Sequence, residues 1–134
     1  MAGANFILDK GFLPEAAVTL FQCVKGGTAN ETVTPVTATG DFVLGVAQEP
    51  ATAGDVTNGR IINVRIMGIT RVIASGAITR YTRVRAHSSG KVIALAGTAG
   101  VNEAVVGIAM YTAADADQID VLLTPGALSN AAIS

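Results

Sequence analysis

Few side chains in this sequence are of types that catalyse reactions. His87 is the only histidine, and it lies beside Ser88 and Ser89, so a Ser–His pair is the one nucleophilic arrangement available. A working triad also needs a carboxylate that orients the imidazole and a rigid scaffold that holds both side chains. A base that neighbours its nucleophile at the tip of a turn has neither. Residues 87–90 lie between two expected strands, 81–86 and 91–95, and are predicted to form a hairpin turn. We interpret His87 as an exposed residue of this turn and predict that the protein is not an enzyme.

The single cysteine, Cys23, limits redox and metal chemistry in a similar way. One cysteine cannot form an intrachain disulfide, and no cysteine cluster is available to hold zinc. A reactive thiol needs access and nearby positive charge, and Lys25 on the same face of the expected strand is the one hint of that setting. Phe21 shares this face, so we interpret Cys23 as a small packed hydrophobic side chain.

The acidic and glycine-rich segments resemble binding loops only in part. Asp115, Asp117 and Asp120 supply closely spaced oxygens of the kind that calcium loops use, but no glycine marks the sharp turn and no glutamate closes the loop. Residues 97–100, Gly-Thr-Ala-Gly, lack the lysine of a phosphate-binding loop. We interpret the acidic segment as a solvated loop and expect neither a metal nor a cofactor.

The charge balance argues against nucleic acid as a partner. Nine basic residues stand against ten acidic ones, aromatics make up 4% of the chain and tryptophan is absent. Nucleic-acid binders normally carry a basic surplus and stacking aromatics. Charged residues are only 14% of the chain, about half the usual share of a soluble domain. We therefore expect much of the surface to be covered by other protein, which predicts assembly.

No part of the sequence has the pattern of a membrane span or a signal peptide. Residues 93–102 are uncharged, but this stretch is far shorter than the ~20 apolar residues of a spanning helix. The first residues lack a basic start and a continuous apolar run. We expect the protein to be made in a cytoplasm, with no membrane partner.

The elements that must position these side chains are strands. Val, Ile and Thr account for 40 of the 134 residues, and β-branched side chains suit a pleated sheet better than a helix. Turn residues recur about every ten positions, which is typical of a small sandwich or barrel. At most one helical turn is expected in each of residues 14–17 and 112–117. The alternation predicts strands over residues 18–24, 42–48, 60–67, 68–74, 81–86, 91–95, 105–110 and 118–123.

The sequence predicts an all-β protein, a small β-barrel or a β-tulip-like or sandwich domain over residues 16–125. Residues 1–15 precede the alternating pattern and are predicted to form an extended N-terminal arm, and residues 126–134 a C-terminal tail. Such an arm can add a strand to the exposed sheet edge of a neighbour. The apolar side chains that would anchor it are Phe6, Ile7, Leu8, Phe12 and Leu13.

One segment of the chain is repeated weakly. Residues 43–47 and 51–55 align with residues 105–109 and 113–117 at an offset of 62. Identities fall at five positions of the first copy, namely Val43, Gly45, Ala47, Ala51 and Asp55. Each copy predicts a strand, a loop of small residues and a second strand. An internal duplication and a coincidence of Ala-, Gly- and Val-rich composition are both compatible with this alignment.

Arginines are concentrated in the middle of the chain. Arginine makes bidentate contacts to carboxylates and is enriched at protein interfaces, where lysine is depleted. Interface contacts are one interpretation, and solvated strand faces paired with acidic residues are the other. Six arginines fall within 26 residues, at positions 60, 65, 71, 80, 83 and 85. We single out Arg65, Arg71, Arg80 and Arg83 as candidate contacts to another protein or to another subunit.

With these residues described, the sequence resembles the capsid decoration, or cement, proteins of tailed bacteriophages. The resemblance spans about residues 11–124 and depends on the succession of short segments, since single pieces such as Gly-Val-Ala are unspecific. The pieces are residues 11–16, 21–25, 34–38, 43–49, 53–55, 64–72, 75–78, 89–92 and 106–109. Residues 80–82, Arg-Tyr-Thr, depart from the glycine-containing turn that is usual in such proteins.

The resemblance implies a small β protein that binds the outer surface of an assembled icosahedral shell and reinforces it after expansion. It implies the major capsid protein as partner, a trimer at three-fold or quasi-three-fold positions, and a place in the virion. It carries over no catalytic residue. The alternative is a small β-barrel ligand- or carbohydrate-binding module. Sugar sites usually stack rings on Trp or Tyr, and only Tyr81 and Tyr111 are available here.

Overall fold

The computed structural model describes residues 6–38, 40–95 and 102–129, and this part of the chain is almost entirely β structure. The predicted all-β class is therefore confirmed. No helix in the described residues is long and apolar enough to cross a membrane. The strands are β1 (Phe6–Pro14), β2 (Cys23–Gly26), β3 (Thr32–Pro35), β4 (Gly45–Ala47), β5 (Ile62–Ile73), β6 (Arg83–Ala86), β7 (Val92–Ala94), β8 (Asn102–Ala109) and β9 (Gln118–Ser129), with one short helix, α1 (Ala53–Thr57).

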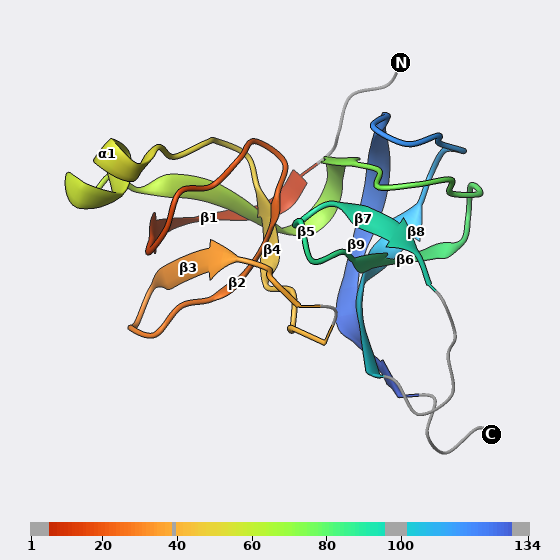
Figure 1. Cartoon of the computed structure of the whole chain (residues 1–134), viewed down its shortest axis with the longest axis horizontal. Helices are drawn as coiled ribbons and strands as arrows, with labels where there is room; N and C mark the ends of the chain where they lie inside the picture. Colours follow the sequence, from red (N-terminus) through yellow and green to blue (C-terminus); the bar gives the residue numbers. More distant parts are fainter. Residues whose placement is uncertain (1–5, 39, 96–101, 130–134) are drawn as a thin grey trace.

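The strands form one large mixed sheet in the order β1-β3-β2-β4-β5-β9-β8-β6-β7, and β1 also pairs with β5. All named strand pairs are antiparallel except β1 with β3. Figure 1 shows two lobes, with β1 to β4 and α1 on one side and β6 to β9 on the other. Of the architectures that the sequence leaves open, a sandwich-like arrangement fits the structure and a closed barrel does not.

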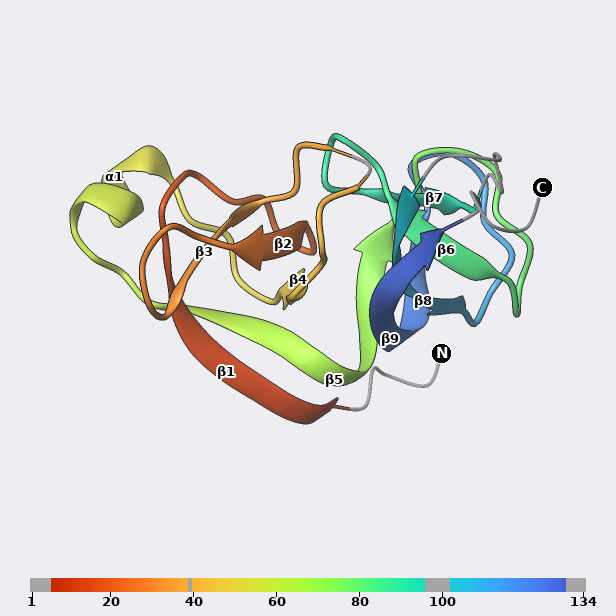
Figure 2. The same ribbon diagram turned by 90° about the horizontal axis from the view of Figure 1, so that it is seen from below.

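β5 joins the two lobes. The sequence predicts two strands, at 60–67 and 68–74, but the structure has a single strand that bends near Gly68, where φ is +112°. Figure 2 shows this curve. Before the bend β5 pairs with β1 and β4, and after it with β9. Glycine accommodates this φ without steric cost, which lets one strand serve both lobes.

The two lobes repeat the same pattern of strand pairing, so we call residues 6–65 unit 1 and residues 66–125 unit 2. β2, β3 and β4 of unit 1 correspond to β6, β7 and the end of β8 in unit 2. The first half of β5 corresponds to β9, and β1 to the second half of β5. The match includes the parallel contact, because Pro14 opposite Val33 in unit 1 is repeated by Ala74 opposite Val92 in unit 2.

The loops repeat as well. Val18 and Ala51 exchange both backbone hydrogen bonds at 2.9 Å, and Ile78 and Ala113 do the same at 2.9 Å. The weak sequence repeat is thus a real structural repeat. The aligned segments extend well beyond the residues that suggested it, and composition alone does not explain two matching sets of hydrogen bonds.

Glycine at the repeated position lets two strands approach closely. A Cβ at Gly45 would overlap the backbone oxygen of Arg65, and a Cβ at Gly107 would overlap the backbone oxygen of Leu122. The two contacts are equivalent, because Val46 lies opposite Arg65 and Ile108 lies opposite Leu122. Any larger side chain at either glycine would push β4 from β5 or β8 from β9.

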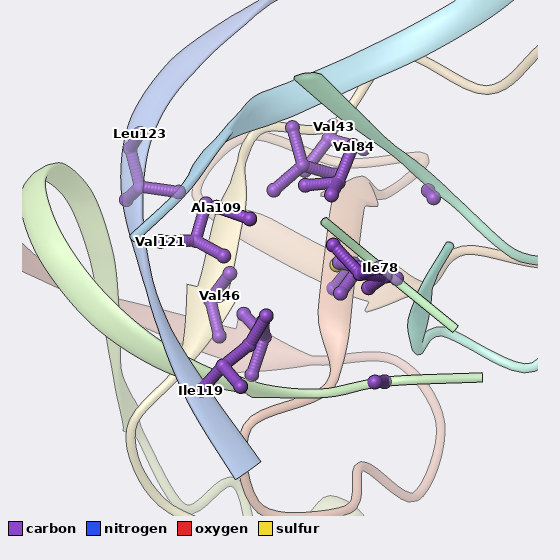
Figure 3. Packing of buried hydrophobic residues seen from close by; sticks show 14 of the residues in the cluster. Val43, Val46, Ile78, Val84, Ala109, Ile119, Val121 and Leu123 are labelled. Carbon is purple, nitrogen blue, oxygen red and sulfur yellow. The ribbon is translucent and has the colours of Figure 1, made fainter. Parts of the chain in front are cut away.

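Each unit has its own apolar interior. In unit 1 it consists of Phe12, Val18, Val24, Val33, Ala47, Ala51, Ile62 and Val64. The larger cluster contains the matching side chains of unit 2 together with four side chains of unit 1, which are Cys23, Val36, Val43 and Val46. Figure 3 shows Val43 and Val46 facing Val84 and Val121 of unit 2. Burial of apolar surface therefore stabilises each unit and also the contact between units.

The ends of the domain differ from the sequence prediction. Residues 6–14, predicted as part of a separate arm, form β1, which pairs with β5 from Phe6 to Phe12, and the Phe12 side chain is buried in unit 1. Residues 126–129, predicted as tail, belong to β9 and pair with β8. Residues 1–5 and 130–134 lie outside the described residues. Backbone pairing with β5 and β8 draws both segments into the sheet.

The short helix also differs from the prediction. Residues 14–17 and 112–117 are not helical, whereas α1 forms in a loop predicted to be irregular. Thr52 caps this helix: its side chain accepts from the Asp55 N–H at 3.1 Å, and the Asp55 carboxylate accepts from the Thr52 N–H at 2.9 Å. The Thr-x-x-Asp spacing of a capping box is the sequence signal that could have located it.

Candidate interaction surfaces

The apolar residues predicted to anchor the arm divide into exposed and buried ones. Ile7 is 70% exposed and Leu8 46% exposed, whereas Phe12 points into the core. Leu13 is 39% exposed at the end of β1, and the backbone of Phe6 pairs with Gly68 of β5. The structure therefore leaves Ile7, Leu8 and Leu13 accessible to a partner and gives Phe12 a role in folding.

An exposed apolar surface lies on the outer face of β1 and β5. Leu8 and Met67 lie opposite one another in the strand pairing, and both are about half exposed. Ile61, 62% exposed, lies over Gly11 at the other end of the pair. We call Ile7, Leu8, Ile61 and Met67 the outer face. Exposed large apolar side chains on a rigid strand pair are the usual sign of a protein contact surface.

A polar network holds the middle of the outer face together. The Arg65 guanidinium donates to the Asp9 carboxylate at 2.8 and 3.1 Å, and to the Ile69 carbonyl at 3.0 Å. Asn63 donates to the same carboxylate at 3.0 Å. The Arg65 and Asp9 side chains are mostly buried. Arg65 therefore fastens β1 to β5 rather than pointing toward solvent.

The structure separates the six clustered arginines by role. Besides Arg65, two others form ion pairs within the chain: Arg60 with Asp55 at 3.3 Å and Arg85 with Glu103 at 3.0 Å. Arg71 is half-buried in β5, whereas Arg80 and Arg83 are exposed. Of the four arginines singled out from the sequence, Arg80 and Arg83 are the best placed for contact with another protein.

One repeated ion pair was missed by sequence reasoning. Lys25 and Asp41 are 2.9 Å apart in unit 1, at positions equivalent to Arg85 and Glu103 in unit 2. A hydrogen bond from Lys25, assisted by backbone N–H groups of Thr37 and Ala38, lowers the pKa of Asp41. Opposite charges that recur 60 and 62 residues apart are the signal that could have revealed the pairing.

The candidate nucleophiles take part in local structure. The His87 Nδ1 atom accepts from the Ser89 N–H at 3.2 Å and lies 2.9 Å from the Ser89 Oγ atom, all within the predicted hairpin turn between β6 and β7. The Cys23 thiol is fully buried, and burial raises its pKa to about 12. A thiol that stays protonated is unreactive, which confirms the interpretation of Cys23 as a packed side chain.

The acidic segment is dispersed by the fold. Asp117 accepts from the Ala114 N–H at 2.9 Å, Asp120 is buried in β9, and Asp115 is exposed. Within residues 6–38, 40–95 and 102–129, no three His, Cys, Asp or Glu side chains are grouped so that they could hold a metal ion. A pocket of about 70 Å³ lies between residues 19–22 and 89–91, far smaller than the ~300 Å³ of small ligand sites.

Comparisons with known proteins extend these observations. A scan against protein-family models finds no match, and neither does a search of curated proteins. Among solved structures, the chain is similar to the crystal structure of the N base of head fiber gp8.5 in bacteriophage phi29. The TM-score is 0.64 and the identity 12%, over 87% of this chain and 93% of that chain. The two chains thus share a fold over most of their length.

Proposed function

We propose that this chain is a structural protein of a phage virion, a decoration protein that binds the outer surface of an assembled capsid and stabilises the expanded shell. The observation that carries the proposal is the fold shared with the base of a phage head fiber. The sequence resemblance to capsid decoration proteins, which spans about residues 11–124, supports it independently. The partner would be the major capsid protein.

The outer face is the surface that fits this role. Its side chains Ile7, Leu8, Ile61 and Met67 are apolar and 46–70% exposed. The buried Arg65–Asp9 pair keeps β1 and β5 together, so the surface is preorganised and little conformational entropy is lost on binding. Covering it with capsid protein would remove apolar area from water, worth roughly 25 cal/mol per Å².

A modest affinity at each copy is enough for a stabilising role. A protein that binds the expanded shell and not the unexpanded one stabilises the expanded state by mass action. When one copy contacts two adjacent capsid subunits, the first contact raises the effective concentration for the second, so that weak contacts together give a stable attachment. The trimer expected from the family resemblance would match three-fold or quasi-three-fold positions by symmetry, and Arg80 and Arg83 would be available for polar contacts at its rim.

The proposal is tested by co-sedimentation of the purified protein with expanded and unexpanded heads of the phage that encodes it. We expect saturable binding to expanded heads and at least tenfold weaker binding to unexpanded ones. Replacing Ile7 and Met67 together by Asp should reduce occupancy at least tenfold, because charge enters the apolar face. Phe42→Asp is the matched control, since Phe42 is 58% exposed but not part of that face.

Two outcomes would contradict the proposal. One is the absence of co-sedimentation with either kind of head, and the other is equal occupancy by the wild type and the doubly substituted protein. Binding of the isolated protein to a glycan panel, abolished by replacing Tyr81 and Tyr111, would instead favour the carbohydrate-binding alternative.

A further inference from the structure

Unit 2 covers one face of unit 1. The Cys23 N–H donates to the Gly90 carbonyl at 2.8 Å, and the Gln22 side chain donates to the Ser89 carbonyl at 3.2 Å. Phe21, in the turn before β2, packs against the larger core cluster. Four outward side chains of unit 1, which are Cys23, Val36, Val43 and Val46, are 0–1% exposed because of this contact.

The equivalent face of unit 2 is not covered in the same way by the described residues. Tyr81 corresponds to Phe21: both have a left-handed backbone, with φ of +63° and +61°, and both donate their N–H to an equivalent alanine carbonyl. Tyr81 is nevertheless 70% exposed. Arg83, the counterpart of Cys23, is exposed, and Ile108, the counterpart of Val46, is half-buried.

Unit 2 covers unit 1 with elements that have counterparts in unit 1. These counterparts lie at the opposite end of the molecule. The covering elements are Ile73 and the hairpin residues 89–91, which line the pocket beside Phe21. Their counterparts in unit 1 are Leu13 and residues 30–32, because Val33 corresponds to Val92 and the left-handed Glu31 to the left-handed Gly90. Leu13 is 39% exposed, residues 30 and 31 are exposed, and residue 32 is half-buried. The chain therefore exposes both surfaces of a contact that it already makes once, between its own two units.

Charge favours joining these two ends. Leu20 and Gly90 line the same pocket at the contact between the units. Their counterparts are Arg80 and Glu31, which carry opposite charges and are both exposed. The Glu31 carboxylate lies 3.2 Å from Lys10 but keeps 72% of its side chain exposed, so it can accept a second cation. Two copies joined in this way would gain an Arg–Glu ion pair at the place that Leu20 and Gly90 occupy in the contact within one chain.

We propose that the unit 2 face formed by Arg80, Tyr81, Arg83 and Ile108 binds the unit 1 end, Leu13 and residues 30–32, of a second copy of this chain. The contact repeats between copies the packing of unit 2 on unit 1. It is head-to-tail, so copies join into a ring where the rotation closes. The contact is inferred from the repeat and does not rest on the proposed binding to a capsid.

The experiment measures the mass of the purified chain in solution by light scattering after size exclusion, with no capsid present. We expect wild type to associate above its chain mass of 13.5 kDa, and Tyr81→Asp and Leu13→Asp each to weaken association at least tenfold. Aspartate tolerates the left-handed conformation at position 81. Phe42→Asp is the control, because Phe42 is 58% exposed but belongs to neither side of the proposed contact.

Mixing the two variants distinguishes a head-to-tail contact from other modes of association. Tyr81→Asp retains a working unit 1 end and Leu13→Asp a working unit 2 face, so the mixture should form dimers and nothing larger. If Leu13→Asp is not folded by circular dichroism, Glu31→Arg replaces it: alone it weakens association, and combined with Arg80→Glu in the same chain it restores association. A monomeric wild type at 100 μM, associated variants, or a mixture that stays monomeric would each overturn the proposal.

Discussion

Unit 1 and unit 2 have the same strand pairing but different surroundings, and the comparison separates residues that form the unit from residues that join it to something else. The interior positions stay apolar in both units, as with Val24 and Val84 or Val64 and Val121. The outward positions diverge: Cys23 is replaced by Arg83 and Leu20 by Arg80. A polar side chain is tolerated at an outward position only where no second unit buries it.

The loops differ between the units for a local reason. Asp55 and Asp117 each accept the backbone N–H three residues earlier, so both loops begin with the same turn. In unit 1 the chain continues into α1 before it reaches β5, whereas in unit 2 it enters β9 directly. A longer loop costs little closure entropy, which explains why the two units tolerate different lengths at this point.

The largest effect is expected at the repeated glycine. Gly107→Ala should destabilise the fold by about 5 kcal/mol, because its Cβ would overlap the Leu122 carbonyl oxygen and separate β8 from β9. Gly45→Ala should cost less, since the approach to Arg65 is less close. Urea denaturation measures both. Gly26→Ala is the control, because no atom lies within 4 Å of the added Cβ; equal stability of Gly26→Ala and Gly107→Ala would contradict the equivalence.

An intermediate effect is expected at the repeated ion pair. Glu103 is 1% exposed and Asp41 21% exposed. Removing the cation with Arg85→Met leaves a buried carboxylate without its ion-pair partner and should cost about 3 kcal/mol. Lys25→Met in unit 1 should cost about 1 kcal/mol or less, since water replaces the lysine.

Thermal and urea unfolding of the two variants measure this difference. The double substitution Arg85→Met with Glu103→Leu should recover most of the loss, because no charge then remains buried. Equal losses for Lys25→Met and Arg85→Met would show that burial does not distinguish the two pairs.

The smallest effect concerns pH. The Lys25 hydrogen bond lowers the folded-state pKa of Asp41 below its ordinary value, so the stabilising contribution is present above about pH 4 and is lost as pH falls toward the folded pKa. The unfolding free energies of wild type and Asp41→Asn should therefore differ at pH 7, by less than about 1 kcal/mol, and converge as the pH falls through the folded-state pKa of Asp41. A difference that grows on acidification would contradict the assigned cause. Added salt should reduce the gap at pH 7.

Much of the fold could be predicted because it depends on local patterns. Abundant β-branched residues and regular turns predicted strands, and the turn at residues 87–90 predicted the β6–β7 hairpin. The identities at Gly45 and Ala47 suggested a repeat that composition could also explain, and the matching strand pairing established it. Sequence reasoning failed where the partner is distant: the pairing of Arg85 with Glu103 and the incorporation of residues 6–14 into the sheet depend on segments brought together only by folding.

The candidate surfaces show the same division. Exposure of Ile7, Leu8 and Leu13 agrees with the predicted contact role, but Phe12 differs from them only in the face of the strand on which it lies. Arg65 and Arg80 are the same residue type in one cluster, yet Arg65 binds Asp9 and Arg80 faces solvent. Charge and hydrophobicity identify candidate contact residues, and the strand register decides which of these side chains is exposed to a partner.

By itself the sequence determined the all-β class and the scarcity of charge and suggested the repeat, because propensity and alternation act over a few residues and composition needs no coordinates. Tertiary structure alone decided that β5 serves both units, that Cys23 is buried whereas Arg83 is exposed, and that Phe21 packs against the core whereas Tyr81 is 70% exposed. These properties depend on which surfaces meet. Equivalent residues of the repeat have equivalent backbone conformations, but packing between the units gives their side chains different environments.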